Sequence, residues 1–220
     1  SLLKALAQTI IGSPLNEKVR MGSLAGMSQR EEVLTQVKKL LASSQLIYGS
    51  LDSVEVVDAD AIKGAFLSPL LLLNEKPFHS NEPHEIEAFG PVSTLMPYNG
   101  MEEAIALSKL GKGSLVTTIV TNNEQEAKKY VLGTASHHGR ILVLNRDCAK
   151  ESTGHGSPLP LLVHGGPGRA GGGEEMGGIR GVKHYLQRTA LQGSPSMITA
   201  ITNVYQPYAK GKEPGKHPFK

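Results

Sequence analysis

Residues 91–145 read PVSTLMPYNGMEEAIALSKLGKGSLVTTIVTNNEQEAKKYVLGTASHHGRILVLN, and this stretch decides the fold. Short apolar or β-branched runs, typical of strands, alternate in it with longer segments that have helical spacing. We expect strands at Pro91–Tyr98, Ser114–Thr121 and Arg140–Asn145. Between them we expect helices at Asn99–Leu110 and Asn123–Ser136. This order favours a mostly parallel sheet covered by helices. The sequence therefore predicts an α/β fold.

Both helices of the stretch begin with a capping signal. Asn99 precedes the first helix with Glu102 three residues on, and Asn123 precedes the second with Glu126 three residues on. Such a pair satisfies backbone N–H groups that have no partner in the first helical turn. On the second helix, helical spacing predicts that three side chains face inward: Ala127, Tyr130 and Val131.

The N-terminal side of the stretch contains further elements. We expect helices at Leu2–Ile11 and Ser28–Ala42 and a strand at Val54–Val57. An extended run is expected at Gly64–Leu73 and a loop at Pro77–Gly90. In the second of these helices, Ser28 and Glu31 form a predicted capping box. Pro69 predicts an edge or a bulge in the extended run.

The C-terminal side is less regular. The pattern predicts a helix at Gly181–Leu191 and a final strand at Ser196–Thr202. From Tyr205 to Lys220, proline, glycine and lysine dominate, which is typical of a linker.

Composition limits the class of protein. The 220 residues carry a formal net charge of +3, and their basic residues are spread out except for Lys210, Lys212, Lys216 and Lys220, so a nucleic-acid partner is not expected. One cysteine excludes an intramolecular disulfide framework, and no apolar run approaches the length of a membrane span. Metal binding is not expected either, because His84-Glu85 begins an H-E-x-x-H motif that fails at Ala88. We expect a cytoplasmic protein.

Glycine fills more than half of the positions from Gly165 to Gly181. Within them, Gly166–Gly171 matches G-x-G-x-x-G, so one hypothesis is a module that binds phosphate or nucleotide. Gly172 and Gly173 are poor formers of the helix that such a cradle needs, which favours a structural loop instead.

Two other short segments carry chemistry. Cys148 follows a strand end and is either a nucleophile, if a base lies near it, or simply a small loop residue. In the segment from Glu87 to Pro91, a carboxylate could hold a ribose diol and the Phe89 ring could pack on a planar cofactor. A turn with a solvated acid is the alternative for that segment.

Four motifs in order resemble the NAD(P)-dependent aldehyde dehydrogenase family. Residues 87–92 (EAFGPV) resemble the family's E-x-F-G-P-V motif, and residues 102–107 (EEAIAL) its D-E-A-I-x-x-A helix. Residues 139–145 (GRILVLN) are similar to its G-x-V-x-V-N strand. The glycine stretch matches the spacing of G-G-x-K-x-S-G-x-G-x-E-x-G, with Gly168 in place of the lysine and Ala170 in place of the serine.

The resemblance covers residues 1–203 and implies the C-terminal part of the family's catalytic domain with its last, oligomerising strand at Ser196–Thr202. The apolar approach to the glycine stretch and the linker at 204–220 look closer to one branch, the bifunctional ring-opening enzymes of phenylacetate degradation. That branch implies a CoA-linked semialdehyde as substrate, a homo-oligomer, and a linker toward a missing hot-dog-fold hydrolase domain.

Residue by residue, the resemblance assigns Glu87 to the cofactor ribose and Phe89 to the nicotinamide, with NADP favoured over NAD. It places Asn145, Arg146 and Cys148 in a loop bordering the aldehyde tunnel. The family's nucleophilic cysteine in G-Q-x-C and its general-base glutamate are both absent from the sequence, so no catalytic residue is assigned. We therefore expect this chain to be inactive in isolation.

Overall fold

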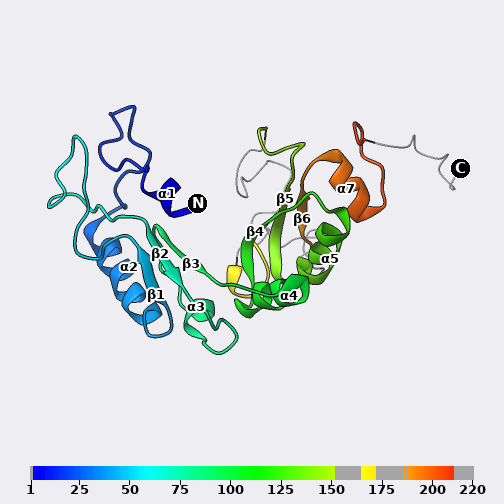
Figure 1. Ribbon diagram of the computed structural model, residues 1–220, viewed down its shortest axis with the longest axis horizontal. Coiled ribbons are helices and arrows are strands. Elements are labelled where there is room, and N and C mark those ends of the chain that lie inside the picture. Colours follow the sequence, from blue (N-terminus) through cyan, green and yellow to red (C-terminus); the bar gives the residue numbers. More distant parts are fainter. Residues whose placement is uncertain (1, 152–164, 172–185, 187, 211–220) are drawn as a thin grey trace, which may run out of the picture. The chain divides into compact units, whose positions relative to one another are not determined.

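The computed structural model describes residues 2–151, 165–171, 186 and 188–210. The chain divides into two compact units, Ser1–Pro97 and Tyr98–Lys220, called here the N-terminal and C-terminal units. Figure 1 shows the elements of both units.

The N-terminal unit is a three-stranded sheet with one long helix. Its elements are α1 (Leu2–Leu6), α2 (Met27–Leu40), β1 (Gln45–Tyr48), β2 (Leu70–Leu73), α3 (Glu82–Glu85) and β3 (Val92–Leu95). The central strand β2 pairs antiparallel with β1 and parallel with β3. Val33 and Val37 of α2 are buried against Leu67 and Leu70, so the apolar stripe of the helix forms the core of this unit.

The C-terminal unit is a parallel three-stranded sheet with helices. Its described elements are α4 (Gly100–Leu110), β4 (Ser114–Val120), α5 (Glu124–Thr134), η1 (Ala135–His137), β5 (His138–Leu144), η2 (Gly168–Ala170), β6 (Ala190–Gln192) and α7 (Pro195–Thr202). The order is β4-β5-β6, with both pairings parallel. Figure 1 shows α4, α5 and α7 beside this sheet. The predicted α/β class, with mostly parallel strands and covering helices, is confirmed.

The stretch from residue 91 to 145 does not build the single continuous sheet that its pattern predicted. Strand β3 pairs with β2 in the N-terminal unit, whereas β4 begins the other sheet. The order of elements was right and the pairing was wrong, because hydrophobic periodicity identifies a strand but not its partner.

Two expectations in the N-terminal unit are also wrong. Only Val57 of the predicted strand Val54–Val57 is bridged, to Gly12, and the strand β1 was missed. Helix α2 begins at Met27 with Gly26 as N-cap and no side-chain cap, so the Ser28–Glu31 capping box does not form.

The second helix of the stretch starts as predicted, since the Asn123 side chain accepts hydrogen bonds from two N–H groups of α5. At the first helix, Glu103 rather than Glu102 accepts the Asn99 N–H, at 2.6 Å. The expected inward residues Ala127, Tyr130 and Val131 of α5 are buried.

The predicted final strand at Ser196–Thr202 is a helix, α7. Ser194 stands at its N-cap and Pro195 at its first turn, where proline's missing N–H costs nothing. Met197 and Ile201, one helical turn apart, supply its buried face. Because Met197, Thr199 and Ile201 stand at every second position, the same residues also fit the alternation of a strand. Pro195 was the sequence signal that favoured the helix.

The end of the predicted helix Gly181–Leu191 is instead strand β6, and residues 181–185 and 187 lie outside the described part.

The first residues of the predicted linker contact α7. The Gln206 N–H donates to Thr199 Oγ1 at 2.9 Å, and the Lys210 N–H donates to Ser196 Oγ at 2.6 Å. No helix among the described residues is long and apolar enough to cross a membrane.

Candidate functional site

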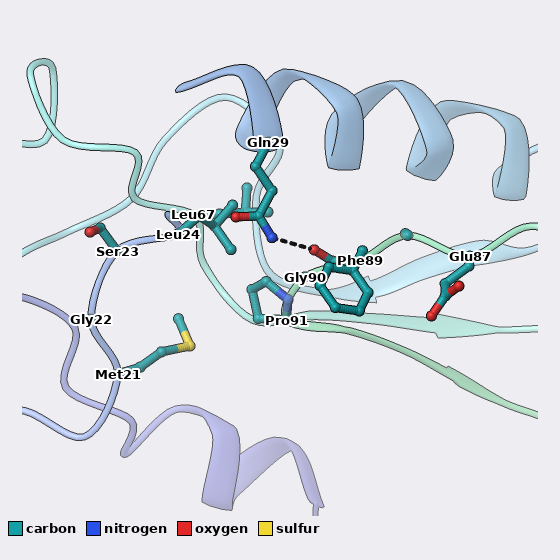
Figure 2. A pocket seen from close by; sticks show the side chains of 11 residues that line it. Met21, Gly22, Ser23, Leu24, Gln29, Leu67, Glu87, Phe89, Gly90 and Pro91 are labelled. Carbon is teal, nitrogen blue, oxygen red and sulfur yellow. Dashed lines mark hydrogen bonds between the residues drawn. The ribbon is translucent and has the colours of Figure 1, made fainter. Parts of the chain in front are cut away.

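An open groove of about 530 Å³ lies in the N-terminal unit. One wall is the Met21–Leu24 segment, and the other is the segment that leads into β3, including Glu87 and Phe89. Figure 2 shows the Glu87 carboxylate and the Phe89 ring on this second segment. The two residues that the sequence suggested for a cofactor therefore line one groove, and Phe89 is 73% exposed.

Gln29, in the first turn of α2, connects the two walls of the groove. Its Nε2 donates to the Phe89 carbonyl oxygen at 2.9 Å, as Figure 2 shows, and its Oε1 accepts from the Ala25 N–H at 3.0 Å. The Gln29 amide thus donates one hydrogen bond and accepts another, and together these bonds hold the backbone on both sides of the groove. No sequence signal marked it, because a glutamine near a helix start is ordinary.

The predicted tunnel residues lie in the C-terminal unit, in the turn that follows β5. Asn145 Nδ2 donates to Ser194 Oγ at 2.9 Å, and the Arg146 N–H donates to Asn122 Oδ1 at 3.0 Å. Asp147 in the same turn pairs with Lys210. These bonds give the turn a defined geometry but do not by themselves form a reactive centre.

Cys148 is half-buried in that turn. Its thiol lies 3.6 Å from the Val143 carbonyl oxygen and 3.8 Å from that of Asn145. Within the described part of the chain, the thiol has no histidine or carboxylate as hydrogen-bond partner. A nucleophilic thiolate needs such a base or a positive field, so the observed geometry favours a loop residue.

The glycine loop at 165–171 packs against the start of β4 and β5. A phosphate cradle needs free backbone N–H groups, yet four N–H groups of this loop already donate to backbone carbonyls. They are Gly166 to Gly171, Arg169 to Lys112, Ala170 to Pro167 and Gly171 to Gly168, at 2.9–3.3 Å. Within residues 165–171, the loop contains the three-residue 3-10 turn η2. This arrangement favours the structural loop over the phosphate module.

His138, at the start of β5, is only 3% exposed. Its Nδ1 lies 2.5 Å from Ser114 Oγ, and its buried Nε2 has no hydrogen-bond partner among the described residues. Burial lowers the pKa of His138 from 6.5 to about 4, and the charge of neighbouring His137 adds to the effect. The imidazole is therefore neutral at pH 7.

The described residues contain no group of three or more His, Cys, Asp or Glu that could hold a metal ion.

Comparison with known proteins gives a consistent match. The model of the aldehyde dehydrogenase family matches residues 1–191. The protein named MaoC from Klebsiella aerogenes is 48% identical over 202 residues, covering 91% of this chain and 58% of that protein. A 3,4-dehydroadipyl-CoA semialdehyde dehydrogenase from Aromatoleum evansii is 35% identical, covering 74% of this chain and 32% of that enzyme. The chain thus spans less than two thirds of either relative.

Solved structures share the fold. Betaine aldehyde dehydrogenase from Staphylococcus aureus, in complex with NAD+, matches 84% of this chain and 34% of its own, with a TM-score of 0.66 and 18% identity. Succinic semialdehyde dehydrogenase from Streptococcus pyogenes, in complex with NADP+, matches 78% and 34%, with a TM-score of 0.62 and 23% identity.

Proposed function

Because this chain belongs to the aldehyde dehydrogenase family, we propose that it is part of an NAD(P)-dependent aldehyde dehydrogenase whose groove holds the nicotinamide half of the cofactor. One observation carries this proposal: Glu87 and Phe89 line the same open groove. Of the two cofactors, the proposal favours NADP over NAD, and this choice rests on the family resemblance alone.

The residues of the groove suit this group. A volume of about 530 Å³ lies within the range of small-molecule sites, roughly 300–1,000 Å³. The Glu87 carboxylate accepts hydrogen bonds from a ribose diol, and the exposed Phe89 ring offers an apolar face to a planar ring. The nicotinamide, when bound, supplies a hydride acceptor. Gln29 keeps the Phe89 backbone in place, so the ring has a fixed anchor.

The proposed substrate of the whole enzyme is a CoA-linked semialdehyde, within phenylacetate degradation. The name of the relative from Aromatoleum evansii supports the CoA-linked class. Residues 204–220 are proposed to lead toward a hydrolase domain, and the whole enzyme to be a cytoplasmic homo-oligomer. Since Ser196–Thr202 is helical here, that segment does not offer the strand pairing first expected for the oligomer.

Two substitutions in the groove test the cofactor proposal. Phe89→Ala is expected to weaken the Kd for the cofactor roughly tenfold, since the planar ring loses its apolar support. Glu87→Gln is expected to weaken it roughly three- to tenfold, because a charged acceptor is lost. Saturation-transfer NMR of the 220-residue chain with NADP+ and with NAD+ measures both changes and detects weak binding.

Matched controls lie in the same unit and outside the groove. Phe78→Ala removes another exposed ring and Glu55→Gln another exposed carboxylate, and neither is expected to change the Kd. Equal weakening by Phe89→Ala and Phe78→Ala would contradict the proposed site. Absence of saturation transfer from both cofactors would contradict binding by this chain.

The chain alone is expected to show no aldehyde oxidation with NAD+ or NADP+. The reason is that Cys148, its one thiol, faces backbone carbonyl oxygens rather than a base. Absorbance of the reduced nicotinamide at a range of aldehyde concentrations measures turnover. Turnover that disappears in Cys148→Ser would assign the nucleophile to Cys148 and overturn this expectation, with Cys148→Ala as a second variant to confirm it.

A further inference from the structure

Asn99-Gly100 is the sole Asn-Gly pair in the 220-residue sequence, and it stands at the start of α4. We propose that this pair is a site of spontaneous covalent modification, at which the Asn99 amide is converted to aspartate and isoaspartate through a cyclic imide. Three features of the folded chain carry the inference: the electrophile, the nucleophile and the space between them.

The electrophile is the side-chain amide of Asn99. Asn99 is exposed, and although it occupies the N-cap of α4, its side chain makes no capping hydrogen bond. The other seven asparagines are Asn16, Asn74, Asn81, Asn122, Asn123, Asn145 and Asn203. All of them except Asn81 use a side-chain oxygen or nitrogen in a hydrogen bond, which holds the amide away from its own backbone.

The nucleophile is the backbone nitrogen of Gly100. As the first residue of α4, Gly100 has no carbonyl one turn earlier in the helix to accept its N–H. This nitrogen is therefore not held in the helical hydrogen-bond ladder, and it can lose its proton and turn toward the Asn99 side chain.

Space is the third feature. Gly100 has φ +76°, a conformation that residues with a Cβ rarely adopt, and a Cβ built on it would meet nothing within 4 Å. The space beside the Gly100 backbone is therefore open. A residue with a side chain in place of Gly100 would hinder the approach of its nitrogen to the amide carbon.

The chemistry is balanced without an oxidant or a cofactor. The Gly100 nitrogen forms a bond to Cγ of Asn99 and loses its proton, and the side-chain nitrogen leaves as ammonia. Water then opens the imide at either carbonyl, so the chain gains a carboxylate as aspartate or as isoaspartate.

The two products differ in their effect on α4. Each lowers the formal net charge from +3 to +2, since one negative charge is added. Aspartate leaves the backbone intact and puts a negative charge at a helix N-terminus, where it is favourable. Isoaspartate adds a carbon to the main chain between the Asn99 N–H, which Glu103 accepts at 2.6 Å, and the first turn of α4.

Asn81 is a matched internal control. It is also exposed, also an N-cap (of α3), and also without a side-chain cap, but Glu82 follows it instead of glycine. The 220-residue chain is incubated at about pH 8 and about 37 °C, and the peptides containing Asn99 and Asn81 are followed by mass spectrometry with chromatographic separation of aspartate from isoaspartate. Conversion at Asn99 is expected to be at least roughly tenfold faster than at Asn81.

Two variants complete the test. Glu82→Gly creates a second Asn-Gly pair and is expected to raise the rate at Asn81 toward that at Asn99. Asn99→Ser removes the amide and is expected to abolish the product, while circular dichroism reports that the fold is kept. Equal rates at Asn99 and Asn81 in the parent chain, or product without isoaspartate, would overturn the proposal.

Discussion

Replacing Gly139 with alanine is expected to destabilise the C-terminal unit by about 3 kcal/mol, at the upper end of the range for overpacking. Gly139 follows His138 at the start of β5, and a Cβ built on it would lie 1.9 Å from the Gly165 carbonyl oxygen. Neither partner can yield easily, because one is the backbone of a buried strand and the other the backbone of the glycine loop. Denaturant unfolding and the exchange of β5 amide hydrogens measure the loss.

Gly111→Ala is the matched control. A Cβ at Gly111 would meet nothing within 4 Å, and its φ of −69° suits any residue, so stability is expected to change by less than about 0.5 kcal/mol. If Gly139→Ala leaves stability unchanged, the glycine loop does not pack on β5 as described. In that case its four backbone hydrogen bonds would no longer argue against a phosphate site.

Acidification from pH 7 to pH 4 is expected to remove up to about 3 kcal/mol of stability through His138 alone. Its folded pKa of about 4 lies below the unfolded value of 6.5, so unfolding takes up a proton between these pH values. The stabilisation is complete above pH 6.5 and is lost as the pH falls to about 4. The drop in pKa from 6.5 to about 4, at about 1.4 kcal/mol per pH unit, sets an upper bound of roughly 3 to 4 kcal/mol, and the last part of it is lost only below pH 4.

An NMR titration of the imidazole signals measures the pKa of His138 directly, in the folded chain. His138→Gln is expected to flatten the dependence of the unfolding free energy on pH between 4 and 6.5, while the exposed His79→Gln keeps it. A His138 signal that titrates near pH 6.5 in the folded chain would contradict the buried, neutral imidazole.

The elements from α4 to β5 followed from local sequence. Asn123 signalled the start of α5, and the apolar run Ile141–Leu144 signalled a buried strand, because each depends on neighbours along the chain. Pairing depends on distant residues, so the sequence did not show that β3 joins β2 rather than β4. The helix α7 was mistaken for a strand because Met197, Thr199 and Ile201 also alternate.

The candidate site was predictable in part. The segment that resembles E-x-F-G-P-V singled out Glu87 and Phe89, and both line one groove. The opposite wall, Met21–Leu24, and the Gln29 amide belong to a much earlier part of the chain. Only the packing of α2 on β2 and its flanks brings them there, and no motif records such packing.

The pairing of β5 with β6 has a consequence for the order in which the chain folds. In the pairing of β5 with β6, Arg140 aligns with Ala190, and in the pairing of β4 with β5, Ser114 aligns with His138. The chain segment between the aligned residues is therefore roughly twice as long for β5–β6 as for β4–β5. The longer closure costs more chain entropy, about 0.6 kcal/mol for each doubling of length, and it cannot occur before Ala190 has been synthesised. The N-terminal unit has all its strands by Leu95. During synthesis it can therefore complete its sheet while the central strand of the other unit still waits for its second neighbour.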